Sequence, residues 1–360
     1  MTTAPPTAAV DRDDLRQRVG AALDAFLGGQ SPRLDAVSEA LGPVQEALCD
    51  FLLRGGKRMR PAFCYWGWRG AGGGDQDAAV AAAASLELLQ ACALIHDDVM
   101  DGSDTRRGQP AMHRRFAALH RGEDWHGDPE AFGVSAAVLL GDLCLIWADE
   151  MLNTSGLAAD ALLRAQPVYD EMRVELMAGQ YLDLLEQALG GGTVESALRV
   201  ARYKSAKYTI EKPLHMGAAL AGAPAEVFEG YSGYGLPLGE AFQLRDDVLG
   251  VFGDPSQTGK PAGDDLREGK RTALVAMALA KASPAQAALV RRHLGDPHLA
   301  ERGVEDLREI LRDTGALARV ETLIAELMDD ALAALEALPV EAEARTVLAE
   351  LAVAATARTV

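Results

Sequence analysis

A long apolar stretch that ends in a group of aspartates limits most strongly what this chain can fold into. Residues 78–95 read AAVAAAASLELLQACALI, and Asp97, Asp98 and Asp101 follow closely. The stretch approaches the length of a membrane-spanning helix, but it is mostly alanine, contains Glu87 and runs into carboxylates. These features predict a helix buried in the core of a globular protein rather than a membrane span.

The rest of the chain has a composition typical of helical proteins. Of its 360 residues, 49% are hydrophobic, with many alanines, and only 5% are aromatic. Runs of β-branched residues are scarce, and helical patterns alternate with short Gly- and Pro-containing breaks. None of these breaks is long or polar enough for an interdomain linker. We therefore predict an all-α, single-domain helical bundle over residues 11–360, preceded by a disordered tail, residues 1–10.

The formal net charge of -18 limits the partners of the protein. An acidic field repels nucleic acid and anionic membrane surfaces, so we expect neither as a partner. It also repels phosphorylated substrates, unless local cations or bound metal ions reverse the sign. The four cysteines show no metal-ligand spacing, and the N-terminus lacks the basic and apolar regions of a signal peptide. These features favour a cytoplasmic location without integral membrane association.

The aspartates after the apolar stretch form a candidate metal site. Asp97 and Asp101 are four residues apart, which places them on one face of a helix with Asp98 alongside. Carboxylates at a helix C-terminus oppose the helix dipole, so they cost stability unless a cation lies between them. Oxygen ligands with space for water and phosphate suit Mg²⁺. Taken alone, the pattern also fits a solvated helix end in an acidic protein.

A second aspartate pair, Asp246 and Asp247, stands at the end of another predicted apolar helix, residues 225–250. Lys260 and Lys270 follow it within the segment FGDPSQTGKPAGDDLREGKR. Ordinary surface lysines in a loop have the same appearance, but two aspartate pairs that are each followed by cations favour a shared site. Facing each other across a cavity, the two pairs would hold one diphosphate through several Mg²⁺ ions.

A glycine-rich basic segment, GGKRMRP at residues 55–61, is a candidate for a second anion site. Its glycines let the backbone approach an anion, and Pro61 suits the first turn of a following helix. Backbone N–H groups together with Lys57 and Arg60 would bind the anion without a metal. A glycine helix cap with a basic flank looks the same, so this motif is weak alone.

The three motifs together carry a resemblance. GGKRMRP, then DDVMD with RRG, then FQLRDD with TGK resemble, in this order, the trans-isoprenyl diphosphate synthases, most closely the bacterial geranylgeranyl type. The resemblance covers roughly residues 40–275. It implies an all-α bundle around a central cavity, a homodimer, and condensation of isopentenyl diphosphate with an allylic diphosphate. It further implies three Mg²⁺ ions per active site, with Mn²⁺ able to substitute.

The resemblance also implies roles for individual residues. The direct metal ligands would be Asp97, Asp101 and Asp246, supported by Asp98 and Asp247. The allylic diphosphate would be bound by Arg106, Lys204, Lys260 and Lys270. Isopentenyl diphosphate would be bound by Lys57, Arg60, Gln90 and Arg107. Polar residues near the developing cation would be Ser205, Gln243, Gln180 and Asp183.

The implied mechanism needs no Ser, Cys or His nucleophile. Cations neutralise the leaving diphosphate, so the allylic C–O bond ionises. The double bond of isopentenyl diphosphate, held close by the second site, attacks the resulting cation. A proton then leaves C2, with the released diphosphate as the base.

The residues before the first aspartate motif bear on product length. Ala93, Cys92 and Leu89 lie four, five and eight residues before Asp97, and Leu86 lies a turn deeper, so on a helix they point down the cavity. The small residues at the first two positions leave room for a C15 chain. Leu89 and Leu86 would form a floor about 5 Å lower, about one isoprene unit. This predicts a C20 product, geranylgeranyl diphosphate, with farnesyl and C25 or longer products as alternatives.

Two departures from the family keep other functions open. The second motif usually ends in Asp, and Gly250 stands there instead, so one supporting carboxylate is missing. The C-terminal TARTV lacks the basic tail of some members. A class I terpene cyclase would need a different second metal motif and no isopentenyl site, so GGKRMRP and RDD argue against it. A non-catalytic partner subunit typically loses its aspartates, and only Gly250 favours that alternative.

Overall fold

The computed structural model describes residues 14–253 and 263–356, and the described chain is almost entirely helical, which confirms the all-α prediction. The predicted disordered tail, residues 1–10, lies outside the described residues. The first half contains α1 (Leu15–Val37), η2 (Glu39–Leu41), α2 (Gly42–Leu53), α3 (Met59–Gly70), α4 (Asp77–Met100), the strands β1 (Thr105–Arg106) and β2 (Gln109–Pro110), α5 (Met112–Gly122), α6 (Pro129–Asn153) and α7 (Ala159–Leu189). The second half contains α8 (Val194–Val200), the π-helix η3 (Ala201–Glu211), α9 (Lys212–Ala221), α10 (Ala225–Phe252), α12 (Asp264–Glu268), α13 (Ala273–Lys281), α14 (Pro284–His293), α15 (Glu301–Asp313), α16 (Ala316–Ala337) and α17 (Ala342–Thr356).

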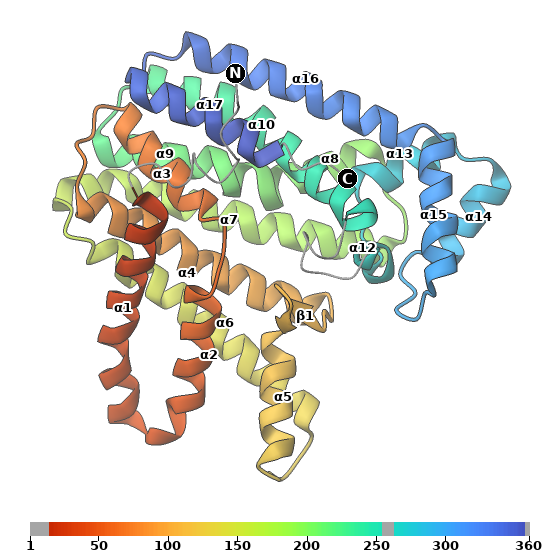
Figure 1. Cartoon of the computed structure of the whole chain (residues 1–360), viewed down its shortest axis with the longest axis horizontal. Helices are drawn as coiled ribbons and strands as arrows, with labels where there is room; N and C mark the ends of the chain where they lie inside the picture. Colours follow the sequence, from red (N-terminus) through yellow and green to blue (C-terminus); the bar gives the residue numbers. More distant parts are fainter. Residues whose placement is uncertain (1–13, 254–262, 357–360) are drawn as a thin grey trace.

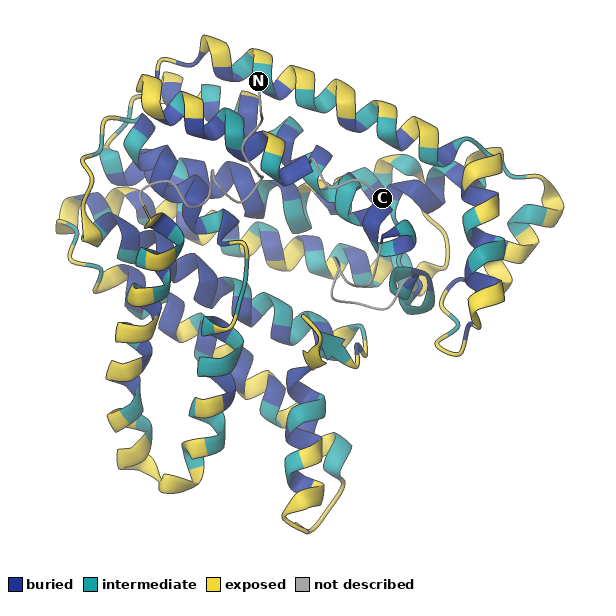
Figure 2. Ribbon diagram, viewed as in Figure 1, coloured by how far each residue is buried: buried dark blue, intermediate teal, exposed yellow. Residues whose placement is uncertain are grey.

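The long helices α7, α10 and α16 run along the length of the molecule, and α1, α2 and α5 project to one side (Figure 1). Buried residues concentrate where α3, α4, α9 and α10 meet, whereas the tips of the projecting helices are exposed (Figure 2). Almost every residue of α3 is buried, and most of the alanine-rich part of α4 is buried too. A second hydrophobic cluster joins the C-terminal half of α10 to α13, α15 and α16.

The helix with the first aspartate motif ends in that motif as predicted, and the helix with the second extends slightly beyond its predicted end at residue 250. α4 continues through Asp97 and Asp98, and Asp101 caps its C-terminus just before Gly102, whose φ of 67° ends the helix. α10 continues past Asp246 and Asp247 to Phe252, despite Pro237 in its interior. Asp97 and Asp98 therefore lie in the last turn of α4, where the helix dipole disfavours negative charge, whereas Asp246 and Asp247 lie more than one turn before the end of α10.

The π-helix η3 is held tightly between α7 and α10 by two glycines. A Cβ atom at Gly179 of α7 would lie 2.5 Å from the backbone N of Lys204, and one at Gly239 of α10 would lie 2.6 Å from Cα of Ala206. Only glycine permits such a close approach of backbones. This packing fixes the segment Lys204–Ser205 against the helices on both sides, in a type of helix that often occurs at functional sites.

In the part of the chain that the structure describes, two helices, α4 and α6, are long and apolar enough to span a membrane by length and composition alone. In the most apolar window of α4, 72% of the residues are buried, as expected for a core helix. For α6 the buried share is 44%, so much of its apolar surface is exposed.

Candidate active site

A cavity of about 420 Å³ lies between α4, α7, η3 and α10. It brings together the predicted site residues Arg60, Gln90, Ala93, Asp97, Arg106, Gln180, Asp183, Lys204, Ser205, Gln243, Asp246, Asp247 and Lys270. Of the remaining predicted residues within the described part, those not lining the cavity are Lys57, Leu86, Leu89, Cys92, Asp98, Asp101 and Arg107. Lys260 lies outside the described residues.

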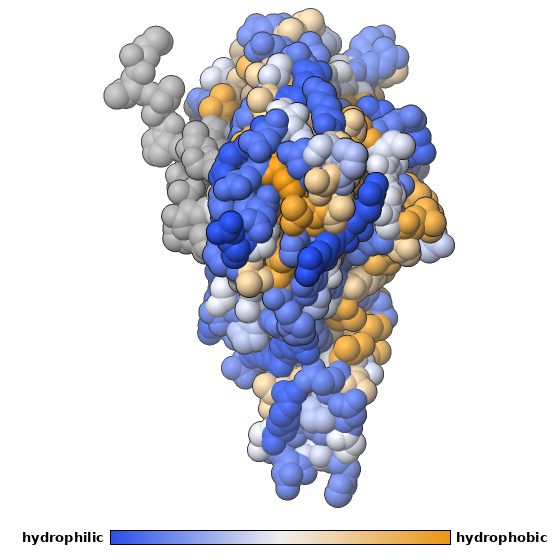
Figure 3. Space-filling model, turned by 90° about the vertical axis from the view of Figure 1, so that its right-hand side faces the viewer, coloured by the Kyte–Doolittle hydropathy of each residue, from blue (hydrophilic) through white to orange (hydrophobic). Residues whose placement is uncertain are grey.

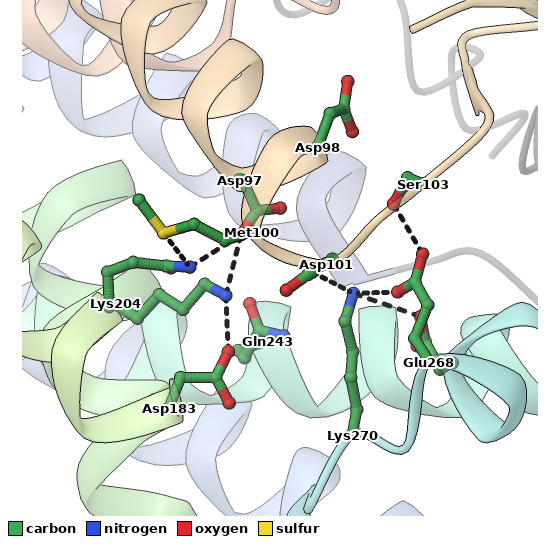
Figure 4. A network of polar contacts seen from close by, with 12 residues as sticks. Asp97, Asp98, Met100, Asp101, Ser103, Asp183, Lys204, Gln243, Glu268 and Lys270 are labelled. Carbon is green, nitrogen blue, oxygen red and sulfur yellow. Dashed lines mark hydrogen bonds and ion pairs between the residues drawn. The ribbon is translucent and has the colours of Figure 1, made fainter. Parts of the chain in front are cut away.

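Asp97 lies at the centre of a polar network on the cavity wall (Figure 4). Its Oδ1 accepts hydrogen bonds from Lys204 Nζ and Gln180 Nε2, each at 3.1 Å. Lys204 Nζ also donates to Asp183 Oδ2 at 2.6 Å. Burial alone would raise the pKa of Asp97, but Lys204, Lys270 and Arg106 hold it well below its usual range. Asp97 is therefore a buried carboxylate that stays ionised.

Asp98 points to Arg106 rather than into the cavity. Its carboxylate is fully buried and accepts two hydrogen bonds from the guanidinium, one of them from Nε at 2.8 Å. The short hairpin of β1 and β2, whose turn includes Arg107 with a φ of 54°, brings Arg106 back to the end of α4. Both hydrogen bonds end on Oδ1, and two charge-assisted hydrogen bonds to one oxygen fix the orientation of the guanidinium. Asp98 thus orients Arg106 at the cavity edge, and a part in metal binding stays a prediction.

Asp101 and Lys270 link the end of α4 to the segment after α12. Lys270 Nζ lies 3.6 Å from Asp101 Oδ2, 3.4 Å from Asp265 Oδ1 and 2.8 Å from Glu268 Oε2 (Figure 4). Glu268 accepts a hydrogen bond of 2.7 Å from Ser103 Oγ. Burial, together with the charge of Asp97, raises the pKa of Asp101 to about 6. The ammonium group of Lys270 therefore compensates the negative charge of Asp101 at the end of α4. It also compensates the charges of Asp265 and Glu268 on α12.

The two residues of the second aspartate pair differ in how deeply they are buried. Asp246 lines the cavity together with Asp247, and Asp247 is almost fully buried. Gln243 Nε2 donates a hydrogen bond of 2.7 Å to Asp247 Oδ1. Burial, with the nearby charges of Asp265 and Asp246, raises the pKa of Asp247 to about 7. Asp97 of the first motif and both aspartates of the second thus line one cavity from helices that are distant in sequence.

The donor atoms fit divalent ions shared with a diphosphate. Within residues 14–253 and 263–356, no three His, Cys, Asp or Glu side chains are gathered as a ready ligand set for one ion. Mg²⁺, however, is usually held by one or two carboxylates together with water and substrate phosphates. Neither buried oxygen of Asp101 has a hydrogen-bond partner among the described residues. Such an oxygen is costly to bury unless a ligand completes its coordination.

The basic segment before α3 forms a separate cationic wall. Arg60 donates a hydrogen bond of 2.7 Å to Thr209 Oγ1, and its guanidinium lies 4.4 Å from the centre of the Tyr208 ring. Gln90 lines the cavity beside it, and its buried Oε1 has no hydrogen-bond partner among the described residues. Arg107, outside the cavity lining, donates a long hydrogen bond of 3.4 Å to the carbonyl oxygen of Phe51.

Sequence reasoning missed a buried ion pair behind this wall. Arg58 donates to the Glu87 carboxylate and to the carbonyl oxygen of Leu52, and both charged side chains are buried. A Cβ atom at Gly56, where φ is 106°, would lie 3.5 Å from Glu87 Oε2 and equally close to Arg107 and Arg58. The sequence did contain a signal for this ion pair. Glu87 is the single charged residue of the apolar stretch 78–95, and a buried charge needs a partner.

Other cavity residues also escaped the motif reading. They are Leu94, Leu176, Ala197, Val200, Ala201, Tyr208, Thr209, Phe242, Leu249, Asp264, Asp265, Arg271 and Thr272. Most are apolar or belong to segments without a marked charge pattern. Asp264 and Asp265 stand in the quoted segment PAGDDLREGKR, where their charge was the available signal.

The sequence matches the family described as polyprenyl synthetase over residues 43–312. The chain belongs to this family. A geranylfarnesyl diphosphate synthase of Aeropyrum pernix is 35% identical over 302 residues, which cover 82% of this chain and 87% of the relative. Octaprenyl diphosphate synthase of Escherichia coli K12 is 34% identical over 293 residues, which cover 79% of this chain and 81% of the relative.

A solved structure of the polyprenyl synthetase fold resembles the chain over nearly its whole length. Geranylgeranyl pyrophosphate synthase from Corynebacterium glutamicum, crystallised with isoprenyl diphosphate and magnesium, is 43% identical and superimposes with a TM-score of 0.93. The match covers 96% of this chain and 99% of that one. The predicted family and fold are therefore confirmed, and the chain is a prenyl diphosphate synthase. The relatives carry names for products of several lengths, so the family alone leaves the product length open.

Proposed function

We propose that this prenyl diphosphate synthase condenses isopentenyl diphosphate with an allylic diphosphate to make geranylgeranyl diphosphate. The observation that carries the proposal is one cavity whose lining includes both a charged and an apolar part. Asp97 and Asp246 face it from opposite helices, whereas Ala93, Leu94 and Leu176 line it with apolar surface. A diphosphate bound at the charged side places its hydrocarbon tail against the apolar side. Because aspartates from both motifs, Asp97 with Asp246 and Asp247, line one cavity, catalysis is favoured over a partner subunit without activity.

The charged side is suited to stabilise a leaving diphosphate. Three Mg²⁺ ions, which Mn²⁺ can replace, would be held by Asp97, Asp101 and Asp246 and would supply positive charge to the diphosphate oxygens. Arg106, oriented by Asp98, contacts the same oxygens. Lys204 stands at the cavity wall, held by Asp97 and Asp183. These groups lie where charge develops as the allylic C–O bond breaks, so they lower the barrier to ionisation.

The cationic wall before α3 serves the second substrate. Lys57, Arg60, Gln90 and Arg107 hold the diphosphate of isopentenyl diphosphate, so that its double bond reaches the allylic carbon. Arg60 is fixed by Thr209 and the ring of Tyr208. Gln243 donates its amide to Asp247, which leaves its carbonyl oxygen to face the allylic cation. The released diphosphate then accepts the proton from C2.

The proposed product length depends on where the cavity ends. Ala93 lines it, whereas Cys92, Leu89 and Leu86 are fully buried and do not line it. On α7, Met172 lies one turn below Leu176 and is buried as well. These side chains form the floor in our proposal. Farnesyl diphosphate and products of C25 or longer remain the alternatives.

Product analysis tests the proposed function. Purified protein is incubated with Mg²⁺, labelled isopentenyl diphosphate and either dimethylallyl, geranyl or farnesyl diphosphate as the primer. We expect a C20 product from farnesyl diphosphate. A C15 product alone would place the floor above Cys92, and longer products would show that Leu89 is no barrier. Folded protein that condenses no primer would contradict the synthase proposal and favour the partner-subunit alternative.

The buried pair of Glu87 and Arg58 gives a prediction for the second substrate site. In Glu87→Gln, Arg58 loses its buried counter-ion, and the segment that carries Lys57 and Arg60 is no longer held in place. We expect the KM for isopentenyl diphosphate to rise about tenfold, the cost of one lost charged hydrogen bond, while the KM for the allylic primer changes little. Steady-state kinetics with each substrate varied in turn measures both values.

The matched control is Glu343→Gln, because Glu343 pairs with Arg69 at 3.1 Å but stands at the surface. This control should leave both KM values unchanged. Equal increases in the two KM values for Glu87→Gln would mean that the pair supports the fold in general rather than the second substrate site.

We further propose that two chains form a homodimer through exposed apolar stripes on α6 and α7. On α6 the exposed apolar side chains are Phe132, Val134, Val138, Leu139 and Ile146. On α7 they are Leu163, Val174, Met177, Tyr181, Leu185 and Leu189. Apolar side chains also gather along the right-hand edge of the molecule in Figure 3. Exposed apolar side chains that recur along a helix are typical of interaction sites.

The dimer is tested by Ile146→Arg. Because a two-fold interface places the change in both copies, we expect the dissociation constant to rise at least about tenfold. Analytical ultracentrifugation over a concentration series measures it. Val37→Arg is the control, because Val37 is also apolar and 77% exposed but belongs to α1 rather than to α6 or α7. A monomeric wild type, or equal behaviour of the two variants, would argue against this interface.

The remaining proposals concern organisation and location. We propose that residues 11–360 form one domain and that the protein acts in the cytoplasm without nucleic acid or integral membrane association. The burial of most of α4 supports this, and the dimer would cover the apolar stripe of α6.

A further inference from the structure

The second aspartate motif has a glycine at the position that corresponds to Asp101 in the first motif. Asp97 and Asp101 are four residues apart at the end of α4. On α10 the residue four positions after Asp246 is Gly250, and it lines the cavity. Residues with this spacing share a helix face, so a carboxylate at position 250 would lie beside Asp246. The helix itself supplies none there.

A carboxylate from another helix occupies this space. A Cβ atom at Gly250 would lie 1.8 Å from Asp265 Oδ2 and 2.5 Å from its Cγ. Asp265 belongs to α12 and also lines the cavity. Atoms cannot approach so closely, so the carboxylate of Asp265 sits where a side chain at position 250 would begin. Glycine at 250 is what allows Asp265 to reach the face of α10.

Several contacts hold Asp265 in this place. Its carbonyl oxygen accepts a hydrogen bond of 3.0 Å from the backbone N of Lys270, and its Oδ1 lies 3.4 Å from Lys270 Nζ. Lys270 in turn lies 3.6 Å from Asp101, whose two buried oxygens have no hydrogen-bond partner among the described residues. Asp265 on α12 and Asp101 at the end of α4 therefore both lie near the ammonium group of Lys270.

We propose that Asp265 supplies the carboxylate that Gly250 lacks and holds a divalent ion on the α10 side together with Asp246. The inference rests on the proposed function, because it assigns a further residue to the same metal–diphosphate site. It makes Gly250 and Asp265 a complementary pair, in which the loss of a side chain on one helix is matched by a carboxylate from another. The carboxylate that the second motif lacks is then supplied by α12 instead of α10.

The test measures Mg²⁺ binding in the presence of inorganic pyrophosphate by isothermal titration calorimetry on the full chain, without any turnover. For Asp265→Ala we expect Mg²⁺ affinity to fall about 10- to 100-fold. Asp265→Asn keeps the shape and should show the same direction of change. Gly250→Ala should also weaken binding, because the added methyl group displaces the carboxylate of Asp265. Circular dichroism confirms that each variant is folded.

A matched pair of double variants makes the test specific. Gly250→Asp in the Asp265→Ala background returns a carboxylate to the same space, and we expect it to recover most of the lost affinity. Gly250→Ala in that background has the space but no carboxylate, and should recover nothing. Equal affinities of the two double variants would overturn the proposal, as would unchanged affinity in Asp265→Asn. A wild type without Mg²⁺-dependent pyrophosphate binding would instead contradict the proposed function itself.

Discussion

Replacing Asp97 by asparagine is expected to lower kcat about 100- to 1,000-fold, while the protein remains folded. Asp97 is the carboxylate that joins α4 to α7 and η3, through Gln180 and Lys204. Asparagine keeps the shape but removes the charge that would hold a metal ion against the leaving diphosphate. The effect should therefore fall on the chemical step. Single-turnover rates with labelled isopentenyl diphosphate and saturating primer measure it.

The control for this variant is Asp104→Asn. Asp104 follows the same motif but lies at the surface, where it pairs with Arg114 at 2.8 Å. Exposed ion pairs contribute little, so neither the rate nor the fold should change. An Asp97→Asn protein with a nearly normal rate would exclude Asp97 as a ligand and require a different metal site.

The second large effect concerns the length of the product. Ala93→Phe is expected to end elongation at C15, because the aromatic ring would enter the cavity that Ala93 lines. The residue beside it, Cys92, is fully buried, so the ring cannot turn aside into the core without strain. Farnesyl diphosphate would then become a product instead of a primer. Mass spectrometry of the dephosphorylated alcohols measures the product distribution.

Ala93→Ser is the matched control, since serine is close to alanine in size and should keep the product of the wild type. Thermal unfolding of both variants separates a filled cavity from a damaged core. An unchanged product from folded Ala93→Phe would show that the growing chain passes elsewhere, for example along Leu176 and Met172 of α7.

The local features of the site were predictable from the sequence. The helices ending in DDVMD and QLRDD were expected at residues 77 and 225 onward, and the structure places them at Asp77–Met100 and Ala225–Phe252. Such predictions succeed because helix periodicity and breaking residues act over a few positions. The order of the three motifs was likewise sufficient for the family, which the match over residues 43–312 confirms.

The partners of the charged side chains were not predictable in the same way. Asp98 and Asp101 belong to one motif, yet Asp98 pairs with Arg106 and Asp101 faces Lys270. Glu87 stood out only as a charge in an apolar stretch, and its partner Arg58 lies beyond a helix and a turn. The partner of each side chain depends on which face of its helix packs against which neighbouring element. Spacing along the chain does not carry that information.

The sequence by itself determined the helical class, the two aspartate-bearing helices and the family, because these follow from local patterns of residue type. Only the tertiary structure decided that the carboxylate of Asp265 occupies the space beside Gly250. It also decided that Lys204, on a π-helix, donates a hydrogen bond to Asp97, and that Ala93 lines the cavity whereas Cys92 does not. The physical reason is that burial and ion pairing arise between segments far apart in the chain. Their geometry exists only once the helices have packed against one another.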